Sequence, residues 1–239
     1  MNKILLITGA SSDIGMSLVE KIADRYDWIL AHYNHWTERL EQIKKSMGEK
    51  IVFIQADFAD EESVLGMIAW IKEKGMEPDH IVHLPAPRAI NQKFVKTEWK
   101  AFEAAWNISL RSAVLLFQAF IPKMQKQRYG KVIVMLSAYT MNLPPKYQTV
   151  YITSKYALLG LMNSLAVEYH DKGITVNGVS PDMIQTKFIT ELPDILVKQY
   201  SENRPQKRIL DVEEVVPTFE FLLSDAADQI TGMNIGIGV

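Results

Sequence analysis

The order of its apolar segments limits most strongly what this chain can fold into. Short runs rich in β-branched residues alternate with longer segments in which apolar residues recur every three or four positions, such as Leu18, Ile22 and Tyr26. The short runs predict strands and the longer segments predict helices. Strict alternation of the two is typical of a parallel sheet covered by helices on both faces. The predicted strands span residues 3–8, 28–32, 51–55, 80–84, 131–137, 174–179 and 233–237.

The length and composition agree with one domain of this kind. The chain has 239 residues, of which 48% are hydrophobic, enough to build one large core. No internal repeat, low-complexity tract or Gly/Ser linker divides it. We therefore expect a single α/β domain over residues 1–239, with a doubly wound, seven-stranded parallel sheet.

Charge and residue usage exclude several classes of function. With a net charge of -2, no general attraction to nucleic acid or to an anionic membrane is expected. The absence of cysteine excludes disulfides and thiolate catalysis. No histidine pair has the helical spacing of a zinc site, so no metal is expected. The apolar run after Lys3 is too short for a secretory signal, and no apolar run is long enough for a membrane span, which predicts a cytoplasmic location.

Two irregular, proline-containing segments, 138–150 and 182–210, follow predicted strands. Ligands bind beyond the carboxyl ends of the strands in open parallel sheets, so both segments should border one cleft. We expect the second to form a substrate lid. The same apolar side chains could equally pack against the domain. The candidate walls of the substrate site are Tyr139, Met141, Leu143, Pro144, Phe188, Ile189 and Leu192.

A phosphate-binding turn is predicted at residues 8–15, TGASSDIG, which follow the first strand and open a helix. Small residues let the backbone turn sharply and approach a pyrophosphate, and the helix N-terminus offers N–H donors and a positive dipole end. The same residues are also compatible with an ordinary strand-to-helix turn in which Asp13 is a first-turn acid.

Tyr151 and Lys155 lie four residues apart at the start of a helix predicted over residues 150–170, so their side chains share one face. A lysine ammonium lowers the pKa of a neighbouring tyrosine from its usual value near 10, and a donor closer to neutrality transfers protons faster. Ser137 ends a predicted strand, and Asn107 lies within a helix predicted over residues 98–125. A surface helix pair and a strand-capping serine are the alternative interpretation.

Together these motifs resemble the short-chain dehydrogenase/reductase family, in particular 3-oxoacyl-acyl-carrier-protein reductases. The resemblance covers nearly the whole chain and is strongest over residues 130–186. It implies a Rossmann-like fold and an NAD(P)-dependent oxidoreductase with the catalytic residues Asn107, Ser137, Tyr151 and Lys155. The family's usual serine-to-tyrosine gap would select Ala138, but the strand register favours Ser137.

The resemblance also implies a set of cofactor contacts. Asp57 would bond the adenine amino group, with a helix cap as its alternative role. No acid ends the second strand to bind ribose hydroxyls, which favours NADP over NAD, although no basic residue stands there either. The implied contacts are Gly9, Ser11, Ser12, Asp13, Ile14, Gly15, Asn34, Asp57, Phe58, Pro85, Ala86, Tyr151, Lys155, Pro181, Ile184 and Thr186.

The family likeness implies reduction of a partly apolar ketone, such as a 3-oxoacyl thioester, to a secondary alcohol. The substrate would be a free small molecule or be carried on an acyl carrier protein, which would dock at Arg128 and Lys172. Family members dimerise through two helices, so a homodimer or homotetramer is expected. The apolar residues of these helices are Ala113, Leu115, Leu116, Phe117, Leu158, Leu159, Leu161 and Met162.

Two departures from the family pattern support an alternative function. Asp13 and Asp182 stand where the family has glycines, and a carboxylate beside a phosphate is repelled by it. Asp13 would then point away from the phosphates, or a cation would lie between them. The chain could instead be a catalytically weak or inactive binding or partner subunit with impaired cofactor binding. An isomerase or dehydratase on the same fold is a third hypothesis, since one fold hosts many reactions.

Overall fold

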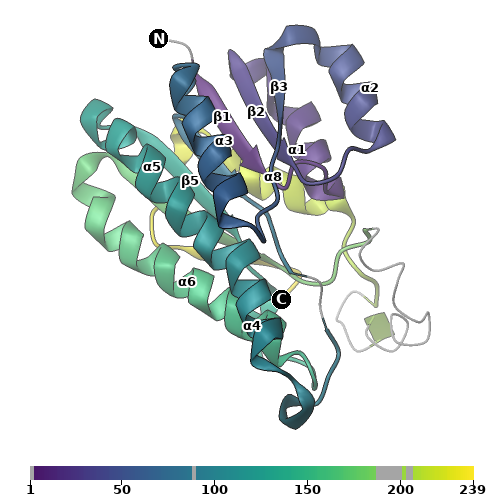
Figure 1. Cartoon of the computed structure of the whole chain (residues 1–239). Coiled ribbons are helices and arrows are strands. Elements are labelled where there is room, and N and C mark those ends of the chain that lie inside the picture. The colour runs from purple at the N-terminus through teal and green to yellow at the C-terminus, as the bar shows by residue number, and fades with distance from the viewer. Residues whose placement is uncertain (1–2, 88–89, 187–200, 203–206) are drawn as a thin grey trace.

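The computed structural model describes residues 3–87, 90–186, 201–202 and 207–239, and contains the seven predicted strands with ends shifted by at most two residues (Figure 1). They form one sheet in the order β3-β2-β1-β4-β5-β6-β7, and each neighbouring pair is parallel. The strands are β1 (Ile4–Thr8), β2 (Trp28–Tyr33), β3 (Ile51–Gln55), β4 (His80–His83), β5 (Gly130–Met135), β6 (Ile174–Pro181) and β7 (Asn234–Ile237).

Helices cover both faces of this sheet, as predicted (Figure 1). One face carries α1 (Asp13–Ile22), α2 (Glu38–Met47) and α8 (Val212–Leu222), and the other carries α3 (Glu61–Glu73), α4 (Trp99–Trp106), α5 (Ser112–Gln127) and α6 (Thr149–Tyr169). The short helices are η1 (Ala23–Arg25), η2 (Gly48–Lys50), η3 (Phe94–Lys96), η4 (Asn107–Arg111), η5 (Ala138–Thr140), η6 (His170–Lys172) and η7 (Asp225–Ala227).

The strand order predicts where a ligand-binding crevice lies. β1 pairs with β2 on one side and with β4 on the other, so the winding of the chain reverses between β1 and β4. Ligands of doubly wound sheets bind at this reversal, beyond the carboxyl ends of the strands. The segments that follow β1, β4 and β5 therefore converge on one site, and these segments hold the predicted cofactor loop and Ser137.

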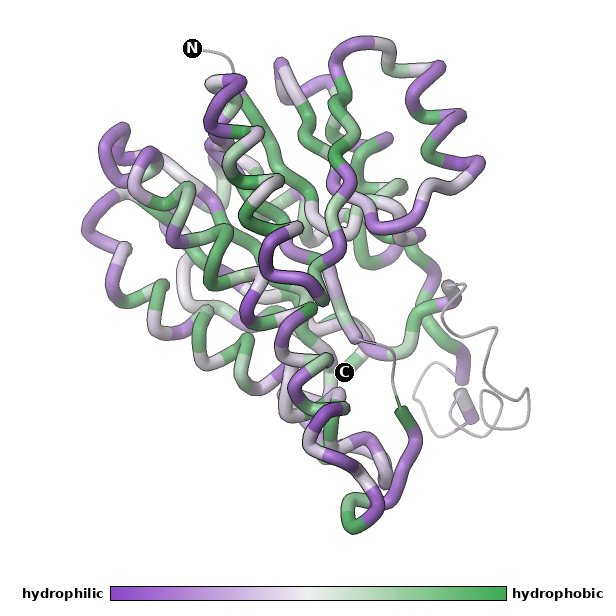
Figure 2. Tube along the Cα trace, viewed as in Figure 1, coloured by the Kyte–Doolittle hydropathy of each residue, from purple (hydrophilic) through white to green (hydrophobic). Residues whose placement is uncertain are grey.

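The core is divided by the sheet into two layers. Successive strand residues point to opposite faces, so Leu5 and Ile7 pack beneath α1 and α8 while Ile4 and Leu6 pack beneath α3 and α5. Both faces are buried, and β1 and β5 are accordingly buried along their whole length and largely apolar, apart from Thr8 and Lys131 (Figure 2).

A long apolar helix crosses one face of the sheet. α4, the π-helical turn η4 and α5 run continuously over Trp99–Gln127, whose length, and mean hydropathy of 1.3 in its most apolar window, are those of a membrane span. The sequence analysis did not anticipate this. Leu116, Phe117 and Phe120 of this helix are buried in the core layer with α3 and α6, so the fold itself uses much of its apolar surface.

The same packing corrects the predicted subunit contact. Of the eight apolar residues proposed to face a second copy, five are at most 2% exposed and belong to the core: Ala113, Leu116, Phe117, Leu158 and Met162. Leu115, Leu159 and Leu161 are partly buried against the same layer. The sequence pattern does not show which side of α6 faces the core, because apolar residues lie all around this helix. Tyr156 and Val167, for example, are exposed.

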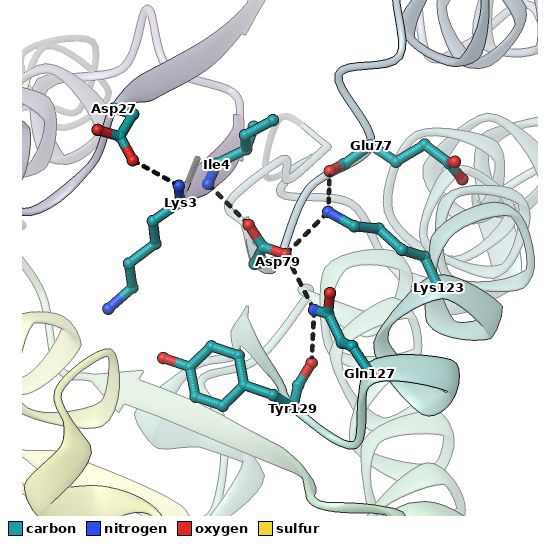
Figure 3. A network of polar contacts seen from close by, with 8 residues as sticks. All are labelled: Lys3, Ile4, Asp27, Glu77, Asp79, Lys123, Gln127 and Tyr129. Carbon is teal, nitrogen blue, oxygen red and sulfur yellow. Dashed lines mark hydrogen bonds and ion pairs between the residues drawn. The ribbon is translucent and has the colours of Figure 1, made fainter. Parts of the chain in front are cut away.

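A buried carboxylate fixes the amino ends of the strands, opposite the functional crevice (Figure 3). Asp79 precedes β4 and accepts hydrogen bonds from the Ile4 amide at 2.8 Å, from Lys123 Nζ at 2.8 Å and from Gln127 Nε2 at 2.9 Å. Burial alone would raise the pKa of Asp79, but these hydrogen bonds hold it below its usual value. The network joins α5 to β1 and β4.

Candidate active site

The predicted cofactor loop is a tight turn between β1 and α1. Gly9 has φ +71°, in the left-handed region, and a Cβ on Gly15 would lie 2.7 Å from the Gly9 carbonyl oxygen. Ser12 caps α1: its hydroxyl accepts the Gly15 N–H at 3.1 Å and donates to the Gly9 carbonyl at 2.8 Å. Ser11, Asp13 and Ile14 are partly exposed beside this helix N-terminus. The turn therefore fits a phosphate group.

A buried histidine from β2 holds this turn in place. His32 accepts the Gly9 N–H on Nδ1 at 3.0 Å and its Nε2 lies 3.0 Å from the Ala56 carbonyl, so the tautomer protonated on Nε2 satisfies both contacts. Burial lowers the pKa of His32 to about 4, which keeps the ring neutral. Phe58 stacks on it with 3.9 Å between ring centroids and is 3% exposed. The Phe58 side chain, predicted to contact the cofactor, is thus enclosed by protein, and only its backbone is available.

A second buried histidine links the loop to the catalytic helices. His83, at the end of β4, lies 2.9 Å from the Thr8 hydroxyl through Nδ1 and 3.0 Å from the Ser109 carbonyl through Nε2. Burial lowers its pKa to about 3. Ser109 belongs to η4, which begins at Asn107. The sequence analysis gave neither histidine a role; their position at the ends of buried strands was the available signal.

The predicted contacts after β4 and β2 flank the loop. Pro85 is half-buried and its nitrogen would lie 3.4 Å from a Cβ on Gly9, while Ala86 is exposed. Asn34 is exposed just beyond β2, and its carbonyl accepts a hydrogen bond from Gln55 Nε2 at 3.1 Å.

Asp57 does not cap the following helix, so that alternative is wrong. The N-cap of α3 is Asp60, whose carboxylate accepts the Glu62 N–H at 3.3 Å. Asp57 instead accepts the Ala59 N–H at 2.9 Å and stays exposed at the carboxyl end of β3. Its carboxylate remains accessible from the crevice side of the sheet.

An arginine that the sequence analysis missed lies beside Asp13. Arg39 of α2 places Nη1 3.9 Å from the Asp13 carboxylate and Nη2 3.2 Å from that of Glu20. A cation was expected only at the end of β2, whereas Arg39 is the second residue of α2. A cavity of about 300 Å³ opens here. It is lined by Asp13, Ser17, Arg39, Gln185, Thr186, Asp211, Val212 and Glu213.

The segment after β6 borders this cavity. Pro181 ends β6, the Asp182 amide donates to the Ile237 carbonyl at 2.9 Å, and Ile184 forms a parallel bridge with Leu210. Thr186 lines the cavity itself. Most of the predicted lid, 182–210, lies outside the described residues, and so do Phe188, Ile189 and Leu192.

The expected catalytic side chains come together beyond β5. Ser137 is the N-cap of η5, where its hydroxyl accepts the Tyr139 N–H at 3.3 Å, and it also hydrogen-bonds to the Tyr151 hydroxyl. Tyr151 and Lys155 lie on one face of α6, with Lys155 Nζ 5.7 Å from the Tyr151 ring centroid. Lys155 is fully buried and donates to the Met135 carbonyl at 2.7 Å. Asn107 begins the π-helical turn η4, which packs against α6.

The pKa shifts of Tyr151 and Lys155 differ from those expected from the sequence. Burial raises the pKa of Tyr151 to about 12, although the Ser137 hydrogen bond lowers it, and burial lowers the pKa of Lys155 to about 7. The prediction that Lys155 lowers the pKa of Tyr151 is therefore wrong for the protein without bound cofactor. The ammonium is itself desolvated, so the lysine gives up its proton before the tyrosine does. Tyr151 stays protonated at neutral pH.

The apolar residues Met141, Leu143 and Pro144, predicted to wall the substrate site, follow η5 and are exposed. Leu143 is 95% exposed and does not pack against the domain, and Pro144 is exposed as well. Met141 is 48% exposed, but a Cβ on Gly236 of β7 would lie 2.9 Å from its sulfur, so Met141 packs partly against the domain. Arg128 and Lys172 lie elsewhere: they precede β5 and β6 at the amino ends, and both contact Asp171. A six-residue strand separates Arg128 from the catalytic end by about 20 Å.

Comparison with known proteins finds relatives over nearly the whole chain. A family model described as enoyl-(acyl carrier protein) reductase matches residues 9–238. The 3-oxoacyl-[acyl-carrier-protein] reductase FabG of Buchnera aphidicola subsp. Acyrthosiphon pisum is 31% identical, with 97% of this chain and 93% of the relative covered. FabG of Staphylococcus epidermidis is 29% identical, with 99% and 98% covered.

Solved structures show the same fold. ElxO with NADP bound superposes with a TM-score of 0.88 at 26% identity, covering 99% of this chain and 97% of that one. 4-hydroxyisoleucine dehydrogenase complexed with NADH gives a TM-score of 0.90 at 22% identity, with 99% and 97% covered. The fold and the site define an NAD(P)-dependent oxidoreductase. The chain belongs to the short-chain dehydrogenase/reductase family and is similar to 3-oxoacyl-acyl-carrier-protein reductases.

Proposed function

We propose that this chain reduces a ketone, a 3-oxoacyl thioester or a similar partly apolar carbonyl compound, to a secondary alcohol with NADPH. The observation that carries the proposal is the arrangement of three side chains at the carboxyl end of β5. The Tyr151 hydroxyl hydrogen-bonds to Ser137, and buried Lys155 lies on the same helical face as Tyr151. Carbonyl reduction needs a positioned proton donor, and Tyr151 is the proposed one.

The protein's own groups supply the proton chemistry, while a bound nicotinamide cofactor supplies the hydride. Tyr151 keeps its proton at neutral pH and donates it to the developing alkoxide oxygen. Ser137 donates a hydrogen bond to the same oxygen and orients the carbonyl. Lys155, whose pKa burial sets at about 7, stabilises the resulting phenolate and returns a proton to it. Asn107 is proposed as the position from which a water molecule connects Lys155 to solvent.

The loop between β1 and α1 is the proposed binding site of the cofactor phosphates. Backbone groups of Ser11 to Gly15 and the α1 N-terminus would bind them, with Asn34 and Asp57 on the adenosine side and Ile184 and Thr186 on the nicotinamide side. NADP is favoured because no acid stands at the end of β2, and because Arg39 adds a cation beside the loop. The likeness to ElxO, whose structure has NADP bound, supports the same choice.

The substrate class rests on the exposed apolar side chains of Met141 and Leu143 and on the likeness to 3-oxoacyl-acyl-carrier-protein reductases. An acyl chain would lie along these side chains with its carbonyl at Tyr151, whether the thioester is free or carried on an acyl carrier protein. We propose that the enzyme works as a homodimer or homotetramer.

Oxidation of NADPH and NADH, followed at 340 nm with short 3-oxoacyl thioesters and with simple ketones of similar length, tests this proposal. We expect thioester-dependent oxidation that is faster with NADPH. Absence of carbonyl-dependent oxidation together with failure to bind NADPH or NADH would favour the catalytically weak or inactive binding subunit instead. Product formed by loss of water or by isomerisation, without cofactor oxidation, would favour the third hypothesis.

A further inference from the structure

The phosphate loop of this chain carries a negative charge at the place where a phosphate is expected. Asp13 is the first residue of α1, and its side chain is 17% exposed. Its neighbours in the cavity of about 300 Å³ include Asp211 and Glu213. Among the described residues that line this cavity, Arg39 carries the only positive charge. An anion entering here meets three carboxylates and one guanidinium.

Arg39 is placed to offset this repulsion. Its Nη1 lies 3.9 Å from Asp13, close enough to attract the carboxylate but longer than a direct hydrogen bond. Its Nη2 is held by Glu20 at 3.2 Å, which anchors the guanidinium over the first turns of α1. The Arg39 side chain is 38% exposed, so part of the fork still faces the cavity. A guanidinium has five N–H donors, so binding to a carboxylate leaves donors for a phosphate.

We propose that Arg39 is the counter-charge through which this enzyme binds a phosphorylated dinucleotide beside Asp13, its guanidinium being shared between the carboxylate and a cofactor phosphate. This inference rests on the proposed function and names a residue that sets cofactor affinity. Asp13 and Arg39 act as a coupled pair: the arginine is needed because the aspartate is present.

A double-mutant cycle on NADPH binding, measured by the change in cofactor fluorescence, tests the coupling. We expect Arg39→Gln to weaken NADPH binding about tenfold, because it removes the guanidinium that offsets the charge of Asp13 beside the phosphate. We expect the same substitution to weaken binding no more than about threefold in an Asp13→Gly background. Arg39→Lys keeps the charge but loses the planar fork, so it should weaken NADPH binding less than Arg39→Gln does but measurably relative to the wild type. Higher salt should shrink the effect of Arg39→Gln.

Arg25→Gln is the matched control. Arg25 is 44% exposed and also forms an ion pair, with Glu220, but it follows α1 at the end remote from the loop. Its substitution should leave NADPH binding unchanged. Thermal melts of each variant in the absence of cofactor report whether the fold is retained.

Each outcome supports or overturns either the role of Arg39 or the proposed function. An Arg39→Gln effect below twofold, or an equal effect in both backgrounds, overturns the inference. A larger loss for NADPH than for NADH assigns the 2′-phosphate as the group bound, and an equal loss assigns the pyrophosphate; both support it. A wild-type chain that binds neither dinucleotide overturns the proposed function and this inference with it, whereas binding without coupling overturns the inference alone.

Discussion

Lys155→Met should make this protein more stable at neutral pH. Lys155 is fully buried, and burial lowers its pKa from 10.5 to about 7. The folded chain therefore binds fewer protons than the unfolded chain between these pH values, and stability rises with pH across that window. The lowered pKa reduces the free energy of unfolding by about 4 kcal/mol at pH 7 but by only about 1.5 kcal/mol at pH 9.5.

Methionine fills a similar volume without a charge, but it cannot donate to the Met135 carbonyl as Lys155 does at 2.7 Å. The lost hydrogen bond costs about 1 kcal/mol at either pH. The variant should thus be about 3 kcal/mol more stable than the wild type at pH 7, raising Tm by about 6–12 °C, and nearly equal to it at pH 9.5. It should also lose turnover.

Urea unfolding of the wild type and of Lys155→Met at pH 7 and pH 9.5 measures the difference. Lys126→Met, at an exposed position of α5, is the control and should show no such pH dependence. A stability difference between Lys155→Met and wild type that stays constant from pH 7 to pH 9.5 would refute the reasoning, because a lysine charged throughout cannot produce the predicted slope.

Two further predictions concern stability at residues other than Lys155. The pKa values of His32, His80 and His83 are lowered to about 4, 3 and 3 by burial, so the unfolded chain takes up protons first as pH falls below 6.5. Together the three histidines should lower the free energy of unfolding by about 6 kcal/mol between pH 8 and pH 5. In urea titrations, His83→Asn should reduce that loss by about 2 kcal/mol. An unchanged loss in this variant would contradict the role assigned to His83. Asp79→Asn should destabilise the protein by about 2–4 kcal/mol by leaving Lys123 without its carboxylate, while NADPH affinity stays constant because Asp79 lies at the amino ends of the strands. Thermal melts and fluorescence titration check both parts, and weakened NADPH binding by this variant would contradict the assigned position.

Local signals in the sequence predicted the fold and the placement of the proposed proton donor. The strand pattern depends on residues close together in the chain, and the spacing of Tyr151 and Lys155 fixes their shared helical face wherever the helix packs. The direction of their pKa shifts could not be obtained in this way. Burial is a property of the assembled domain, and desolvation outweighed the attraction that was expected between the two groups.

The other differences come from contacts between distant segments. Arg39 approaches Asp13 only because α2 packs beside α1, and His83 reaches Ser109 only because η4 lies over the end of β4. Composition alone also misplaced Leu116 and Met162 at a subunit contact, since it cannot distinguish apolar residues that cover the sheet from those that face outward. The histidines at the ends of apolar strands, His32 and His83, were the one sequence signal of the contacts that hold the loop and η4.

Turnover by Tyr151→Phe, with NADPH binding measured on the same sample, tests the proposed mechanism most directly. Tyr156→Phe is the matched control, because Tyr156 lies on the same helix but is 48% exposed. We predict that Tyr151→Phe loses carbonyl-dependent NADPH oxidation at least about a hundredfold while binding NADPH as the wild type does, and that Tyr156→Phe retains both. Wild-type turnover by Tyr151→Phe would contradict the assignment of this phenol as the proton donor.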